Sequence, residues 1–168
     1  MFLTLTRIAL VALAGASLLG ACRSASPART SRIAPLVVFV CDHGNVKSLI
    51  AASLFNQMAA ARGLPVRAES RGLNPEEGVP APIAAALTHE GIDLSTFRSR
   101  ALSREDAKAA DRVIAIGVDL ASFRGDAGRP IEEWMDVPPA SVDYPASRAA
   151  LVRHIEALLG ELQGKRPK

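Results

Sequence analysis

The sequence predicts an α/β fold, a doubly wound sandwich with a small parallel sheet of about four strands and helices on both faces. Short apolar runs at 36–40 and 113–116 are typical of buried strands, and segments with helical periodicity lie between and after them. Strands that alternate with helices favour a parallel sheet with right-handed crossovers. Such sheets bind ligands at the carboxyl ends of their strands, which directs attention to the loops there.

The first predicted strand is Leu36–Val40 (LVVFV), a continuous apolar and β-branched run. This pattern is expected of a strand that is covered on both faces. A polar segment at 41–48 follows it, and the next helix ends before Gly63. That helix is predicted from apolar residues at helical spacing, namely Ile50, Leu54, Met58 and Ala61.

The later elements rest on shorter signals. Ser103 and Asp106 have the spacing of a capping box, which predicts a helix start. The last helix has a core-facing apolar stripe. We expect strands at 66–69, 113–116 and 131–134, a loop at 74–78, a helix at 82–90 that ends at Gly91, and a final helix carrying Leu151, Ile155, Leu158, Leu159 and Leu162.

The N-terminus has the pattern of a targeting signal. Arg7 precedes an apolar run at 8–19, which is too short to span a bilayer comfortably. The run ends in Leu19–Cys22 (LGAC), which resembles the lipobox of bacterial lipoproteins. The resemblance implies cleavage before Cys22 and a diacylglyceryl group on its thiol. The alternative is an ordinary secretory signal in which Cys22 is incidental.

The same resemblance sets the expected location and boundaries. Arg23 is not the aspartate that the resemblance associates with retention in the inner membrane, so we expect an outer-membrane anchor that faces the periplasm. Several buried acyl chains anchor a protein far more firmly than one. We expect a signal peptide at 1–21, a lipidated tether at 22–35, a single domain at 36–162 and a basic tail at 163–168.

Charge and cysteine content exclude several classes. The chain has 20 Lys and Arg against 17 Asp and Glu, a near balance that argues against nucleic-acid binding and against a polybasic membrane domain. Cys22 and Cys41 are the only cysteines. With Cys22 acylated, neither a disulfide within the domain nor a cysteine-rich metal site can form, and we expect no cofactor and no metal.

The segment between the first strand and the first helix is suited to bind an oxyanion. A thiol, Cys41, ends the strand, and Lys47 and Ser48 open the helix. A helix N-terminus presents unpaired N–H groups and a partial positive charge, which suit a tetrahedral anion and favour a thiolate. Gly44 permits a tight backbone path. Alternatively, Cys41 is simply a small buried residue at a strand end.

This layout resembles the loop of the low-molecular-weight protein tyrosine phosphatase and arsenate reductase family. The family's loop is a cysteine, five residues, an arginine and a serine or threonine, and here Cys41, Lys47 and Ser48 keep that spacing. The similarity extends over residues 36–162. Further matching segments are Ser70–Gly72, Gly91-Ile92, Arg98–Arg100 and Ala110–Ile114.

The resemblance implies roles for the loop residues. Cys41 would attack phosphorus, Lys47 would take the place of the arginine that grips phosphoryl oxygens, and Ser48 would hydrogen-bond the sulfur. The loop N–H groups would complete the cradle. The phosphate-binding residues so implied are Asp42, His43, Gly44, Asn45, Val46 and Lys47.

The sequence departs from the family pattern at three places. Lysine lacks the planar fork with which arginine holds two oxygens. Asp42 beside the nucleophile repels an anion unless it points outward, although His43 can offset it by hydrogen bonding. The family's late Asp-Pro pair, which supplies the leaving-group acid, is Pro-Pro at 138–139, so Asp136, or alternatively Asp143, is expected to act instead.

Two function classes follow. The first is a phosphomonoesterase with a cysteinyl-phosphate intermediate, acting on a phosphorylated small molecule or protein of the aryl or tyrosine phosphate type. The second is a non-catalytic oxyanion-binding envelope lipoprotein. Arsenate reduction is disfavoured because the further cysteines that it requires are absent. Outside the loop, His89 and His154 are expected to be solvated, Asp111 to fix a strand entry or act chemically, and Trp134 to be a core or rim anchor.

Overall fold

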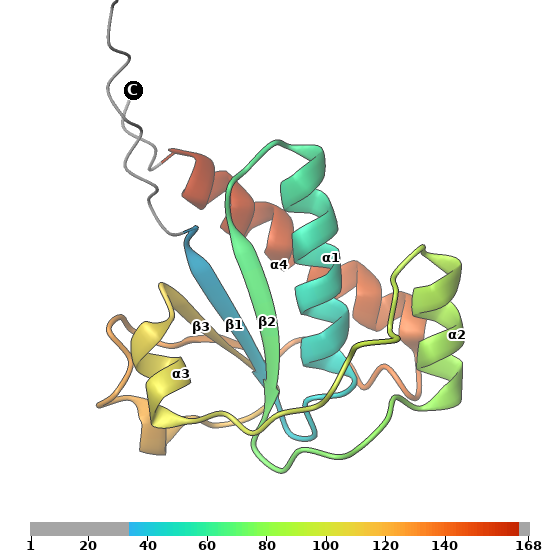
Figure 1. Cartoon of the computed structure of the whole chain (residues 1–168), viewed down its shortest axis with the longest axis horizontal. Helices are drawn as coiled ribbons and strands as arrows, with labels where there is room; N and C mark the ends of the chain where they lie inside the picture. Colours follow the sequence, from blue (N-terminus) through green and yellow to red (C-terminus); the bar gives the residue numbers. More distant parts are fainter. Residues whose placement is uncertain (1–33, 165–168) are drawn as a thin grey trace, which may run out of the picture. The chain divides into compact units, whose positions relative to one another are not determined.

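The computed structural model describes residues 34–164 of the chain (Figure 1). The signal peptide, Cys22, most of the predicted tether and the last four residues lie outside the described part. Within the described part, no helix is both long enough and apolar enough to cross a membrane.

Strands and helices alternate along the chain as the sequence predicts, and the sheet has four strands. Between β3 and β4 lies a short 3-10 helix, η1. The elements are β1 (Leu36–Cys41), α1 (Lys47–Ala61), β2 (Arg67–Gly72), α2 (Ala81–His89), α3 (Arg104–Ala109), β3 (Arg112–Ile116), η1 (Ala121–Phe123), β4 (Glu132–Trp134) and α4 (Tyr144–Gly164).

The sheet is parallel throughout, with strand order β2-β1-β3-β4. The chain leaves β1 towards β2 on one side and later returns to place β3 on the other. The carboxyl ends of β1 and β3 therefore lie at the topological switch point, where open α/β sheets form their ligand crevice. The predicted α/β class is confirmed.

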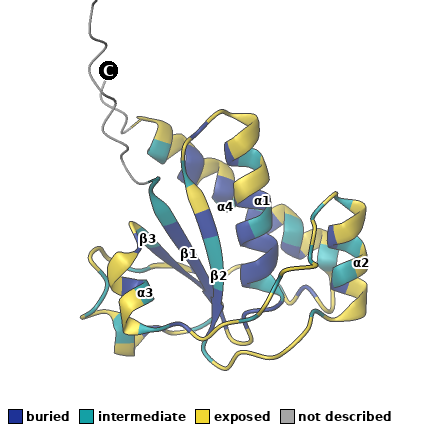
Figure 2. Ribbon diagram, viewed as in Figure 1, coloured by how far each residue is buried: buried dark blue, intermediate teal, exposed yellow. Residues whose placement is uncertain are grey.

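Each face of the sheet has its own apolar cluster. Val37 and Phe39 belong to the cluster on the side of α1 and α4, to which α2 also contributes, whereas Val38 and Val40 belong to the cluster on the side of α3 and η1. Alternate strand residues point to opposite faces, so β1 is buried on both sides, as its sequence predicts. Figure 2 shows the dark blue of buried residues along β1, β3 and the inner side of α1.

The second strand differs from its prediction. It runs over Arg67–Gly72 instead of 66–69, because its ladder with β1 continues to the pair of Cys41 and Gly72. The sequence hides this extension, since Arg71 is charged and yet only 5% exposed. Its guanidinium is neutralised by Glu69 and by Asp106.

The helix and strand ends follow local signals. The predicted capping box is present, since the Ser103 hydroxyl accepts from the Asp106 N–H and the Asp106 carboxylate accepts from the Ser103 N–H. Asp111 fixes a strand entry, because its Oδ2 accepts from the Leu36 N–H at 2.9 Å. The last helix continues to Gly164, beyond the domain end predicted at residue 162.

Candidate active site

The thiol of Cys41 lies at the carboxyl end of the central strand β1. The residue is only 3% exposed, yet it lines a pocket of about 330 Å³. Its Sγ is 3.1 Å from Ser48 Oγ and 3.5 Å from the Ser48 N–H, in the first turn of α1. The predicted contact between Ser48 and the sulfur is therefore present. The Ser48 N–H donates to the sulfur, and the Ser48 hydroxyl lies within hydrogen-bond distance of it.

The backbone of the loop at 42–46 turns its carbonyl oxygens away from the pocket and onto the segment after β2. The carbonyls of Cys41, Asp42 and His43 accept N–H groups from residues 73, 74 and 76, at 3.1, 2.8 and 3.1 Å. The N–H groups of residues 42–47 find no acceptor within residues 34–164. A row of unpaired N–H groups at a helix start is the arrangement that binds an oxyanion.

Two glycines allow this loop to lie against β2. Gly44 has φ +74°, a conformation in which side chains other than glycine are strained. A Cβ on Gly72 would lie 2.8 Å from Gly44 N and 2.8 Å from the His43 carbonyl carbon. The Ser99 hydroxyl also donates to the His43 carbonyl at 2.8 Å. The loop is thus held from the β2 side by backbone contacts that leave no room for a methyl group.

Lys47 supplies the positive charge of the pocket. Its ammonium reaches the end of β3, since a Cβ on Gly117 would collide with Lys47 Nζ. Gly117 has φ +66° and lines the same pocket together with Val118. No carboxylate within residues 34–164 pairs with Lys47, so its charge remains available to an anion.

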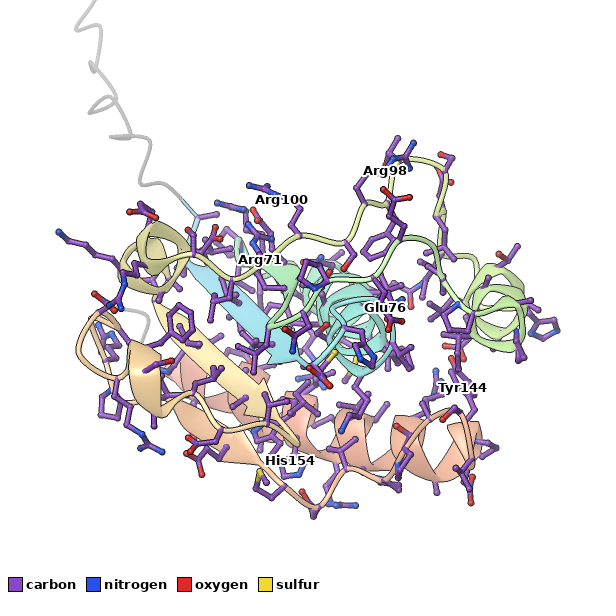
Figure 3. The ribbon with its side chains drawn as sticks, turned by 90° about the horizontal axis from the view of Figure 1, so that it is seen from below. Arg71, Glu76, Arg98, Arg100, Tyr144 and His154 are labelled. Carbon is purple, nitrogen blue, oxygen red and sulfur yellow. The ribbon has the colours of Figure 1, made fainter. Side chains whose placement is uncertain are left out.

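The mouth of the pocket carries the opposite charge. Asp42 has a partner at each carboxylate oxygen. Its Oδ1 accepts from Asn74 Nδ2 at 2.9 Å, and its Oδ2 lies 3.4 Å from His43 Nε2. His43 Nε2 is also 3.5 Å from Glu76 Oε1. Figure 3 labels Glu76, which comes from the loop after β2. An imidazole between two carboxylates therefore borders the anion cradle.

Asn45 fixes the far side of the loop. It is 3% exposed, and its Nδ2 donates to the Gly78 carbonyl at 2.9 Å, which ties the loop to the segment before α2. Its Oδ1 is buried without a hydrogen-bond partner in the described part of the chain. Val46 occupies the N-cap position of α1 without a side-chain cap, which leaves the N–H of Lys47 at the helix start to a ligand.

The structure does not bring either predicted aspartate into the pocket. Asp136 accepts from Arg153 Nη2 at 2.7 Å and lies 2.6 Å from His154 Nε2, and the hydrogen bond to His154 is the main reason why the pKa of its carboxyl is lowered. Asp143 Oδ1 accepts from the Ala146 N–H at the start of α4. The late loop instead contributes Pro139, Ala140 and Ser141 to the pocket lining.

The expectation that His154 is solvated is wrong. Its ring stacks on Trp134 with centroids 4.6 Å apart and planes inclined by 14°, and Trp134 is only 1% exposed. Figure 3 labels His154 on α4. Trp134 is therefore a core anchor, which the sequence left open against a rim position. Asp136 and His154 form a contact between the segment after β4 and α4.

Several residues of the site were not predicted. Gly117 lies directly after an apolar strand, and the general position of ligand sites at strand ends was the one signal that pointed to it. Glu76, Asn74 and Ser99 lie in irregular segments, whose contacts with the loop have no periodic signature. Only Ser99 belonged to a segment singled out by resemblance.

The comparisons agree with this geometry. A sequence profile of the low molecular weight phosphotyrosine protein phosphatase family matches residues 36–122, more than half of the chain. The chain belongs to this family. A comparison with curated proteins gives no significant match.

Several solved structures share the fold. YfkJ from Bacillus subtilis has a TM-score of 0.69 at 23% identity over 82% of this chain and 99% of its own. The low molecular weight protein tyrosine phosphatase from T. tengcongensis has a TM-score of 0.58 at 27% identity over 76% and 99%. A thioredoxin-dependent arsenate reductase from Corynebacterium glutamicum has a TM-score of 0.66 at 21% identity over 81% and 65%.

Family membership makes this chain a phosphatase-like enzyme. The similar structures include both a protein tyrosine phosphatase and arsenate reductases, so proteins with two different activities share this fold. The residues of the pocket, and not the fold, decide which of the two activities a chain has.

Proposed function

We propose that the chain hydrolyses phosphomonoesters of the aryl or tyrosine phosphate type through a cysteinyl-phosphate intermediate on Cys41. The observation that carries the proposal is the environment of the sulfur. It accepts from the Ser48 backbone N–H, faces a pocket, and lies at the start of a loop whose N–H groups at 42–47 are unpaired within residues 34–164. Lys47 adds the full charge that a phosphate dianion requires.

In the first step the Cys41 thiolate attacks phosphorus, an S–P bond forms, and the P–O bond to the leaving group breaks. In the second step water attacks phosphorus and the S–P bond breaks, which returns the thiolate and releases inorganic phosphate. Ser48 stabilises the departing thiolate by donating to it. The N–H groups of the loop stabilise the charge that develops on the equatorial oxygens.

The test uses the full chain in detergent with an aryl phosphate as substrate. Cys41→Ser is expected to lower turnover at least about 10³-fold, because the hydroxyl is a much weaker nucleophile at neutral pH. Cys22→Ser makes the same atomic change outside the domain and is expected to leave turnover unaltered. Turnover that survives Cys41→Ser would remove both the intermediate and this proposal.

A second variant examines the cation. Lys47→Arg is expected to raise turnover, because a planar guanidinium holds two phosphoryl oxygens at once. Lys108→Arg, on the exposed surface of α3, is the matched control. A fall in turnover would mean that the space beside Gly117 is shaped for lysine.

A non-catalytic oxyanion receptor is the second candidate. The pocket lining favours it in one respect, since the late loop contributes no carboxylate that could protonate a leaving group. This candidate predicts that inorganic phosphate or vanadate raises the unfolding temperature of the full chain although no aryl phosphate is turned over. Arsenate reduction is disfavoured, because Cys41 is the one cysteine of the described residues.

We also propose that the chain is a lipoprotein of the cell envelope, with residues 1–21 as signal peptide, 22–35 as lipidated tether and the outer membrane as anchor. The support is the lipobox-like segment Leu19–Cys22 and the residue after it, Arg23. Metabolic labelling with a radioactive fatty acid tests it. Label should be incorporated into the wild-type chain and lost in Cys22→Ser, whereas label in neither chain would contradict the proposal.

A further inference from the structure

One titratable residue that lines the pocket, His43, has no role yet in the proposed chemistry. The titratable residues among those that line the pocket are Cys41, Asp42, His43 and Lys47. Cys41 is the proposed nucleophile, and Lys47 is needed as a cation for the anion. A proton for the leaving oxygen must therefore come from Asp42, from His43 or from solvent.

Asp42 is arranged as an acceptor. Its Oδ1 receives a hydrogen bond from Asn74 Nδ2 at 2.9 Å, and its Oδ2 lies 3.4 Å from His43 Nε2. The amide N–H of Asn74 donates to this carboxylate, and the His43 ring nitrogen lies beside its other oxygen, so both carboxylate oxygens face possible donors. Asp42 is therefore suited to position the ring of His43.

The imidazole of His43 lies between two carboxylates. Its Nε2 lies between Asp42 at 3.4 Å and Glu76 at 3.5 Å, and these carboxylates come from two different segments. The His43 carbonyl is held by the Glu76 N–H at 3.1 Å and by Ser99 Oγ at 2.8 Å, so the backbone that carries the ring is fixed. The side chain is 46% exposed, which gives it access to solvent protons.

The other ring nitrogen is free to act. Nδ1 of His43 has no hydrogen-bond partner within residues 34–164. Both carboxylates contact Nε2, so a protonated ring retains an N–H at Nδ1 that no protein acceptor uses. The charged groups that face this ring are Asp42 on its own loop and Glu76 after β2, and Cys41 and Lys47 line the same pocket.

We propose that His43, positioned by Asp42 and Glu76, is the general acid of the reaction in place of an aspartate from the late loop and donates its proton when the ring is protonated. This assignment rests on the proposed phosphatase function. As the P–O bond breaks, its electron pair goes to the leaving oxygen, which takes a proton from His43. The neutral imidazole then takes a proton from the water that attacks the S–P intermediate, and the imidazolium is restored.

The test compares two substrates of the full chain in detergent, phenyl phosphate and the activated 4-nitrophenyl phosphate, by kcat/KM across pH. For His43→Gln, kcat/KM is expected to fall about 10²- to 10⁴-fold on phenyl phosphate and much less on the activated ester, which needs no proton. The alkaline limb of the wild-type profile should disappear. His89→Gln, at an exposed position at the end of α2, should change neither substrate.

Glu76→Gln separates proton donation from a purely structural role. Removal of a negative charge that faces the imidazolium favours its neutral form, so the alkaline limb should move to lower pH while the maximal rate is retained. An unmoved limb contradicts the arrangement described above. Thermal unfolding of each variant is measured beside the kinetics, so that a loss of fold is recognised.

The variants distinguish failure of the His43 proposal from failure of the proposed phosphatase function. If Cys41→Ser retains turnover, the proposed function fails. If Cys41→Ser is inactive while His43→Gln lowers both substrates equally, or neither, the phosphatase stands and the proton donor is overturned. It is overturned as well if Asp143→Asn, and not His43→Gln, abolishes the alkaline limb.

Discussion

The contact between Gly72 and the loop gives the sharpest prediction, which concerns Gly72→Ala. The new Cβ would lie 2.8 Å from Gly44 N, 2.8 Å from the His43 carbonyl carbon and 3.0 Å from the Asp42 carbonyl oxygen. All three atoms belong to backbone, so no flexible side chain can yield. Restoring an ordinary separation of about 3.5 Å requires the loop to move by roughly 0.7 Å.

Two effects of known size follow from that shift. Overpacking of this kind costs about 1–3 kcal/mol of unfolding free energy. A displacement near 1 Å of a catalytic group costs about 10²-fold in rate, and the shifted N–H groups are those that hold the phosphoryl oxygens. We therefore expect Gly72→Ala to lower kcat/KM for an aryl phosphate by about 10²-fold, with a smaller loss of stability.

The assay combines urea unfolding with turnover of 4-nitrophenyl phosphate. Gly160→Ala is the matched control, because a Cβ there meets nothing within 4 Å and the residue lies in the interior of α4. It should raise the unfolding free energy by up to ~1 kcal/mol and leave turnover unchanged. Wild-type turnover in Gly72→Ala would refute the reasoning, since the loop would then tolerate displacement.

Other predictions concern the charges and the single tyrosine. Asp106→Asn should lower the free energy of unfolding in urea by about 2 kcal/mol, because it weakens the pairing of the buried Arg71. The hydrogen bond from Arg71 is the main reason that the pKa of the Asp106 carboxyl is lowered, so the wild type loses stability as pH falls below about 4. The variant should lose less stability over that pH range. Burial raises the pKa of Tyr144, the chain's only tyrosine, to about 12, so this residue should ionise near pH 12 in the native state and near pH 10 when unfolded. Its contribution to stability should be complete below pH 10 and should be lost as pH rises through 12. An ultraviolet titration of the native protein with a midpoint near pH 10 would contradict this. Gly117→Ala should weaken phosphate binding in a thermal-shift titration, because its methyl group displaces the Lys47 ammonium, and unchanged binding would mean that the ammonium makes no contact with the anion.

The anion cradle could be predicted because its parts are contiguous. Cys41, Lys47 and Ser48 lie on one loop between a strand and a helix that each have a clear apolar pattern. Strand and helix fix both ends of the loop, so the spacing alone brings the hydroxyl to the sulfur. The sheet followed from the same patterns, apart from the extension of β2 to Gly72, where charged residues interrupt the apolar signal.

The mouth of the pocket could not be predicted, since its contacts join irregular segments. His43 follows β1 and Glu76 follows β2, and no local sequence pattern predicts the contact between their side chains. The late loop shows the opposite case. Asp136 looked available in the sequence, but Arg153 and His154, consecutive residues of α4, hold its carboxylate. Pairing over such distances depends on how the helix packs, which periodicity does not specify.

The three carbonyl hydrogen bonds between the loop and the segment after β2 have a consequence for ligand recognition. Because these bonds form without a ligand, the loop is already ordered when an anion arrives, and binding pays little conformational entropy. Selectivity should then follow the fixed spacing of the N–H groups, so tetrahedral oxyanions of phosphate size should be preferred over planar ones. The empty and occupied forms should differ in side-chain positions at the rim and hardly at all in the backbone of residues 41–48.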